Sequence, residues 1–478
     1  MNGKLIAAIA ALVFAFSAAA GPANSCTDPY WKDTLRCVLF PNEPPQPNLG
    51  DVPVVGNGQP VPAFTRLFLT NDDVRCTDGT RPLIYVDKAV CTDANGCPGG
   101  IARGEAIESN RWIFTMTGGS SCHGQRCALF YTEPDERGFM GSSTKPAMKN
   151  MEGIHDPDPV RNPVFASYNR VRVEKCSFDR YMGRSQEVAP GGAIRATLPN
   201  GTTVSFNAWY HGFFIMRETF RTLQDGLRYV TWRRDDSLSP AKRRSCCGAT
   251  GGTQLSPVIE TLPPLADAEV VLLIGHSNAS HGLYHNADNL AAELASIPGF
   301  HGDVRALFDE NFQPGVENEA AFATTAPPNS DHYSGIWSGT SSARGETFSY
   351  DGAVYHATNE VDLEYAVHGA VHDRSCLDAH AADGTAWRCR DRLHIVSNHI
   401  TTPFMIHQDF TDPNRDHLDT PNGYWVRWGN AANYSYCPDA QPCEPRFNAA
   451  EFRTRIEKQI QTLLASALTR SELARGLD

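Results

Sequence analysis

The sequence predicts an α/β fold with a mostly parallel central sheet, flanking helices and long, disulfide-stapled loops. Three observations lead to this class. A near-continuous aliphatic run at residues 268–274 is typical of a parallel strand buried on both faces. Strand-like runs alternate with amphipathic helical stretches. Fourteen cysteines, several of them close in sequence, indicate disulfides formed in an oxidising compartment.

The elements follow from apolar patterning. A short apolar run before a glycine turn predicts a buried strand at residues 111–116, and helical spacing of apolar residues predicts helices at 212–223 and 448–468. We expect the main strand at residues 268–274, a helix at 289–297, and a second buried run at 404–406. No linker or internal repeat divides the chain, so one large domain is expected despite the length.

The N-terminus predicts export. A short basic start, an apolar run at residues 5–16 and small residues up to Ala20 are typical of a signal peptide cleaved after Ala20, or else after Ala23. The apolar run is shorter than the roughly 20 residues of a membrane span, and no later stretch is long enough. We expect a secreted or periplasmic protein with a signal peptide at 1–20, an irregular arm at 21–100 and a single domain at 101–478.

Charge and cysteine spacing restrict the ligands. The net charge of −12 argues against nucleic acid as a partner. The chain has no Cys-x-x-Cys pair, so no metal site is expected. Short spacings instead favour local disulfides, although sequence alone leaves the connectivity open. The close pairs are Cys91 and Cys97, Cys122 and Cys127, Cys376 and Cys389, and Cys437 and Cys443.

The stretch Gly275-His276-Ser277-Asn278-Ala279 follows the main predicted strand. A serine at such a strand-to-helix corner exposes its hydroxyl at the top of an α/β-hydrolase sheet, and the crowded flanking positions must be small. The alternative is an ordinary serine helix cap. As a nucleophile, Ser277 needs a base and oxyanion donors, and the backbone N–H of Asn278 is placed to be one donor. The glycines of the turn at residues 118–121 allow close backbone approach to a ligand.

An ordered series of motifs resembles the pectin acetylesterase/Notum family of secreted carboxylesterases. The series is Thr117-Gly118-Gly119-Ser120-Ser121-Cys122, Met140-Gly141-Ser142-Ser143, residues 162–171, Lys175-Cys176-Ser177, Gly275-His276-Ser277, residues 303–309 and residues 402–408. The family's Gly-x-Ser-Ala-Gly-Gly pattern, with an Asp eleven residues after the Ser, matches Ser277 and Asp288 without a gap. The sequence departs from this pattern at Ala279 and Ser280, which replace glycines, and at Ser120, which replaces the tryptophan of Notum-like members.

The resemblance implies roles for individual residues. Ser277 would be the nucleophile, and backbone N–H groups of Gly119, Ser120 and Asn278 would hold the oxyanion. Asp412 would orient the base, with Asp409 as the alternative acid.

The base is the largest departure from the family. The family's histidine follows the last amphipathic helix, whereas the final histidine here is His417, so the expected position lies beyond residue 478. His417 is the substitute nearest in sequence to Asp412. His276, His281 and His285 flank the serine, and the pairs His281/His285 and His368/His372 have metal-like spacing but no acidic or cysteine partner in register.

These observations predict a secreted serine carboxylesterase. It would remove an acyl group, O-acetyl by resemblance, from a carbohydrate or other extracytoplasmic ester through an acyl-enzyme, with no cofactor. By resemblance the substrate is an acetylated polysaccharide, or a longer acyl ester as in Notum-like members. The alternative is a truncated or non-catalytic member of the scaffold that binds a ligand but lacks the base. The sequence leaves the oligomeric state open.

Overall fold

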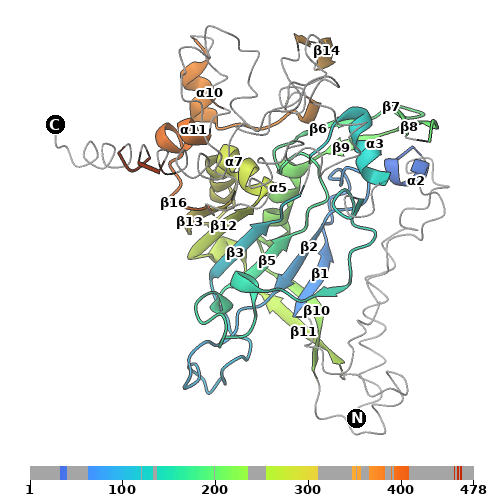
Figure 1. Ribbon diagram of the computed structural model, residues 1–478. Helices are drawn as coiled ribbons and strands as arrows, with labels where there is room; N and C mark the ends of the chain where they lie inside the picture. The colour runs from blue at the N-terminus through green and yellow to red at the C-terminus, as the bar shows by residue number, and fades with distance from the viewer. Residues whose placement is uncertain are drawn as a thin grey trace, which may run out of the picture.

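The computed structural model describes most of the segment between residues 63 and 408 and short pieces outside it (Figure 1). The described residues are 33–39, 63–119, 121–132, 137–198, 200–234, 255–310, 347–350, 353–356, 365, 367–382, 389, 392–408, 457, 460, 461 and 463–465.

An eight-stranded sheet forms the centre of the fold, in the order β16-β13-β12-β3-β5-β2-β1-β4. Its pairs from β16 to β5 are parallel and its pairs from β5 to β4 are antiparallel. This arrangement confirms the predicted α/β class with a mostly parallel sheet. The strands are β16 (Phe404–His407), β13 (Asp303–Asp309), β12 (Val270–His276), β3 (Arg111–Met116), β5 (Asn169–Val173), β2 (Leu83–Asp87), β1 (Phe64–Phe68) and β4 (Met148–Lys149).

Helices α5 (Gly212–Leu223) and α7 (Asn278–Ala295) lie side by side over one face of the sheet (Figure 1). Aliphatic residues of β12 and aromatic residues of both helices share one buried core, in which the Tyr284 ring stacks on Phe308 of β13 at 4.1 Å between centroids. Helices α10 (Arg374–His380) and α11 (Arg392–Asn398) follow in sequence, and α11 packs against α7. The remaining helices named in the described residues are α2 (Leu35–Leu39) and α3 (Gly124–Thr132).

Four two-stranded sheets accompany this core among the described residues. They are β10 (Leu227–Arg234) with β11 (Leu255–Leu262), β6 (Ser185–Glu187) with β9 (Ala208–Tyr210), β7 (Ile194–Thr197) with β8 (Thr203–Phe206), and β14 (Thr347–Tyr350) with β15 (Ala353–His356). Short 3-10 turns occur at Gly153–His155, Phe165–Ser167 and Leu265–Asp267.

Most of the predicted elements are present, with shifts. The strand at 111–116 and the helix at 212–223 are confirmed. The main strand lies two residues later than predicted, and the helix predicted at 289–297 begins at Asn278. The prediction of a buried run at 404–406 was wrong: β16 is an edge strand whose Met405 is 64% exposed. Most of the helix predicted at 448–468 lies outside the described residues.

The N-terminal region also differs from the prediction. Residues 21–100 were expected to be irregular, yet β1 and β2 lie within them and pair in the central sheet. Both strands are only five residues long, which is why their pattern did not stand out. Over the described part of the chain, no helix is both long and apolar enough to cross a membrane.

Disulfides staple the loops as predicted. The close pairs Cys91–Cys97, Cys122–Cys127 and Cys376–Cys389 are bonded. A fourth bridge, Cys76–Cys176, spans 100 residues and was not anticipated. The expected Cys437–Cys443 pair lies outside the described residues.

Candidate active site at Ser277

Ser277 occupies a strained corner between β12, which ends at His276, and α7, which begins at Asn278. Its backbone has φ 54° and ψ −123°, a conformation that residues other than glycine rarely adopt. Its side chain makes no capping hydrogen bond to the helix, so the interpretation as an ordinary helix cap has no support. Strain of this kind persists where surrounding structure enforces it, often at reactive sites, and this geometry is that of a nucleophile elbow.

Two glycines make the corner sterically feasible. A Cβ on Gly275 would lie 2.6 Å from Ser280 Cα, so only glycine fits beneath the start of α7. A Cβ on Gly118 would lie 2.7 Å from Ser277 Cβ and 3.3 Å from its Oγ. The backbone of the loop after β3 is therefore pressed directly against the serine.

A side-chain hydrogen bond joins this loop to the helix. Asn278 Nδ2 donates to the carbonyl oxygen of Gly119 over 2.7 Å. Gly119 has φ 133°, in the region that favours glycine. The structure thus brings together Ser277, Gly119 and Asn278, three of the predicted site residues, while Ser120 lies outside the described residues.

Lys175 was not singled out by the sequence analysis. It is only 1% exposed, and its Nζ lies 3.1 Å from where a Cβ on Gly119 would sit and 4.9 Å from the centre of the Phe178 ring. Its backbone N–H donates to Thr117 Oγ1. A buried ammonium therefore adjoins the glycine loop. The sequence offered Lys175 only as part of the Lys-Cys-Ser motif, and a motif does not reveal where a side chain points.

Asp309 holds two histidines at the carboxyl edge of the sheet. His276 Nδ1 lies 2.8 Å from one of its carboxylate oxygens and His407 Nδ1 lies 2.7 Å from the other. Burial alone would raise the pKa of Asp309, but the hydrogen bonds from both rings lower it below its usual value. The hydrogen bond to Asp309 raises the pKa of His276.

The backbone of Asp309 also contacts Ser277, because its carbonyl accepts the Ser277 N–H over 2.9 Å. Since the carboxylate is ionised, each Nδ1–H donates to it, and each basic Nε2 faces away from it. This is how a carboxylate orients a catalytic imidazole.

Asp288, the family-pattern residue on α7, fixes the entry to β16. One carboxylate oxygen accepts from the backbone N–H and hydroxyl of Thr401, and the other accepts from those of Thr402, over 2.6 to 2.9 Å. These threonines lead through Pro403 into β16, after which the predicted acids follow. Asp409, Asp412 and His417 themselves lie outside the described residues.

The buried His281 and His285 of α7 form a cluster with Tyr365 and the half-buried His372. His281 Nε2 contacts the Tyr365 hydroxyl, and His285 Nδ1 lies 3.4 Å from His372 Nδ1. Burial lowers the pKa of all three histidines, that of His372 to about 4, so they are neutral near pH 7. The cluster packs the first turns of α7 against Tyr365 and His372.

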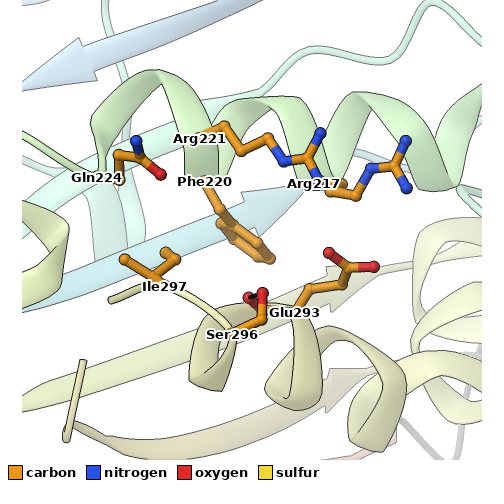
Figure 2. Close-up of a pocket in the computed structure, with 7 residues that line it drawn as sticks. All are labelled: Arg217, Phe220, Arg221, Gln224, Glu293, Ser296 and Ile297. Atoms are coloured by element: carbon orange, nitrogen blue, oxygen red, sulfur yellow. Dashed lines mark hydrogen bonds between the residues drawn. The ribbon is translucent and has the colours of Figure 1, made fainter. Parts of the chain in front are cut away.

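The cavity shown in Figure 2 lies away from the serine. Its volume is about 120 Å³, and it lies between α5 and the end of α7, with Arg217, Phe220 and Glu293 in its wall. Glu293 is 16 residues after Ser277 along one helix, which corresponds to roughly 24 Å at ~1.5 Å per residue. This cavity is therefore not the site of the elbow.

Comparison with known proteins places this chain in a family. Residues 65–225 match the family model described as Pectinacetylesterase. A relative from Danio rerio, inactive palmitoleoyl-protein carboxylesterase notum1b, is 30% identical over 125 residues, which cover 26% of this chain and 77% of the relative. The chain belongs to the pectin acetylesterase/Notum family.

Other members of this family match over a smaller share of their own length. The palmitoleoyl-protein carboxylesterase notum2 of Xenopus laevis is 28% identical over 132 residues, 27% of this chain and 23% of that protein. The palmitoleoyl-protein carboxylesterase NOTUM of Drosophila melanogaster is 27% identical over 133 residues, 28% of this chain and 17% of that protein. The match thus spans under a quarter of the length of either. The solved structure of the Wnt deacylase Notum from Drosophila has a TM-score of 0.45 and 18% identity, covering 76% of this chain and 78% of that one.

Proposed function

We propose that this protein is an exported serine carboxylesterase whose nucleophile is Ser277. The observation that carries the proposal is the strained backbone of Ser277 at the corner between β12 and α7. Ser277 Oγ would attack the acyl carbonyl, and backbone N–H groups of Gly119, Ser120 and Asn278 would stabilise the oxyanion. The acyl-enzyme would then be released by water.

The acid and base are part of the same proposal. Asp412, or alternatively Asp409, would orient a histidine, with His417 as the base that the sequence offers. The described residues add His276 and His407, which Asp309 orients through their Nδ1 atoms. Replacing His276, His407 and His417 singly by alanine distinguishes them, because removing the true base lowers the rate by about 10²–10⁴-fold, while the other two changes leave most of it.

The family model and the relatives' names support different acyl groups. A pectinacetylesterase model favours an O-acetyl group on a polysaccharide. The name palmitoleoyl-protein carboxylesterase indicates a fatty acyl group on a protein for that relative. We propose the acetylated polysaccharide as the substrate, and p-nitrophenyl esters of increasing chain length test this choice: a rate that rises from acetate to octanoate would contradict it.

The test of catalysis compares the purified protein with Ser277→Ala. The esterase proposal predicts p-nitrophenyl acetate hydrolysis that this change abolishes while far-ultraviolet circular dichroism stays the same. Equal rates in both proteins would show that Ser277 is not the nucleophile.

The second candidate is a non-catalytic binding protein on the same scaffold. It is favoured by the Danio rerio relative, whose name describes it as inactive. Folded wild-type protein with no hydrolysis above the Ser277→Ala background, across the whole ester series, would support this candidate over the esterase.

A further inference from the structure

Three histidines converge where helices α10 and α11 meet. His380 ends α10, His394 lies on α11, and His399 follows that helix. His394 Nε2 lies 2.9 Å from His380 Nε2 and 3.3 Å from His399 Nε2. Cys376 Sγ and one nitrogen from each ring all lie within 4.8 Å of one another.

We propose that His380, His394 and His399 bind a Zn²⁺ ion through their Nε2 atoms. Zn²⁺ takes imidazole nitrogens at 2.0–2.1 Å in a tetrahedral arrangement, which places two such nitrogens roughly 3.3–3.4 Å apart. The His394–His399 pair already has this separation, and the His380–His394 pair needs to open by roughly 0.4 Å. Water would take the fourth position.

The orientation of the rings fits this role. Their planes make angles of 53°, 54° and 67° with one another, so the rings are not stacked and their nitrogens can point to a common centre. All three side chains are half-buried, so an ion can reach them from solvent.

A hydrogen-bonded chain fixes His399. Ser375 Oγ donates its proton to Asp373 over 2.8 Å, so it must accept from His399 Nδ1 at 3.1 Å. The proton on Nδ1 leaves the Nε2 lone pair of His399 directed into the cluster. Metal-binding histidines are held in this way by hydrogen bonds from their other ring nitrogen. Asp373 is itself 2% exposed and caps α10 through the Cys376 N–H.

His394 holds the proton that the metal would displace. Asn398 Nδ2 lies 3.3 Å from its Nδ1, which therefore accepts, and the ring proton sits on Nε2 between the other two histidines. Zinc binding at Nε2 moves this single ring proton to Nδ1, so Asn398 Nδ2 no longer donates there but keeps its 2.9 Å hydrogen bond to the His394 carbonyl oxygen.

Cys376 is not a ligand in this proposal. It is bonded to Cys389, and a disulfide sulfur is not the thiolate that zinc binds. The ion would join α10 to α11 just before Thr401, where Asp288 anchors the entry to β16. None of the three histidine ligands belongs to the elbow at Ser277, so zinc binding should not depend on that serine.

Calorimetric titration of ZnCl₂ into the full-length protein, without an affinity tag and with disulfides intact, tests the proposal. We expect one ion per chain and at least a tenfold loss of affinity in each of His380→Ala, His394→Ala and His399→Ala. His301→Ala, which replaces an exposed histidine elsewhere, should bind like wild type. Ser375→Ala removes the hydroxyl that orients His399, and we expect it to weaken binding by about tenfold.

Absence of stoichiometric binding by wild type, or three variants that bind like His301→Ala, would overturn the proposal. If a variant fails to fold, X-ray absorption of the zinc-loaded wild type decides instead. Three imidazole nitrogens at about 2.0–2.1 Å support the site, whereas a sulfur at about 2.3 Å contradicts the donor set. Ser277→Ala should bind zinc as wild type does, which separates this proposal from the esterase.

Discussion

Replacing Gly118 by alanine should disable the elbow without unfolding the protein. The new Cβ would lie 2.7 Å from Ser277 Cβ and 2.8 Å from the His276 carbonyl oxygen. Carbon atoms in contact are normally about 3.5–4.0 Å apart, so the loop and the serine must separate by roughly 1 Å. A displacement of about 1 Å from the productive geometry can lower the rate about 10²-fold, which is about 2.7 kcal/mol of transition-state stabilisation.

Gly118→Ala should lower the free energy of unfolding without preventing the protein from folding. Overpacking of this kind costs about 1–3 kcal/mol. Gly201→Ala is the matched control. Its φ of 82° disfavours a residue with a side chain, so the protein should lose stability, but nothing lies within 4 Å of the added Cβ. The assay is kcat/KM for p-nitrophenyl acetate with the melting temperature of each variant. Wild-type kcat/KM in a folded Gly118→Ala protein would refute the assigned geometry.

Three further changes test the supporting interactions. Asp288→Ala removes four accepted hydrogen bonds, and we expect a loss of about 1–3 kcal/mol in the free energy of unfolding, measured by urea denaturation with Asp288→Asn as the milder control. Asp309→Asn should lower the pKa of His276, which the carboxylate raises, and NMR titration of the ring measures it. The raised pKa of His276 stabilises the folded state fully below about pH 6.5, the ordinary pKa of histidine, and this stabilisation is lost as the pH rises through the higher pKa of the folded state. Asp309→Asn should therefore reduce the melting temperature more at pH 5.5 than at pH 9, and an equal reduction would contradict this. Removing the Cys76–Cys176 bridge, which spans 100 residues, should cost about 4–5 kcal/mol by loop entropy, and an unchanged melting temperature would contradict that expectation.

The elbow could be predicted from sequence because its parts are local. Most of its geometry is set by a buried strand, a glycine and a serine within a few residues. The glycine loop after β3 could be recognised from its sequence motif alone. The start of α7 was missed because buried histidines and Tyr284 interrupt the apolar pattern of its first turns. The exposure of β16 depends on its place at the sheet edge, which no pattern within the strand reports.

Interactions across elements lay beyond the sequence. His276, Asp309 and His407 meet because parallel pairing aligns the last residues of β12, β13 and β16. Their spacings of 33 and 98 residues carry no signal by themselves. The three-histidine cluster likewise depends on how α10 lies against α11, which neither cysteine spacing nor the closely spaced histidine pairs could indicate.

The most direct test of Ser277 as the nucleophile is to identify the residue that a fluorophosphonate probe modifies. The probe phosphonylates an activated serine, and mass spectrometry of the digested protein locates the adduct. With Ser277 as the nucleophile, we expect one adduct, on the peptide that contains Ser277, and none after denaturation before labelling. An adduct on a different serine, or a folded wild-type protein that takes up no probe, would contradict it.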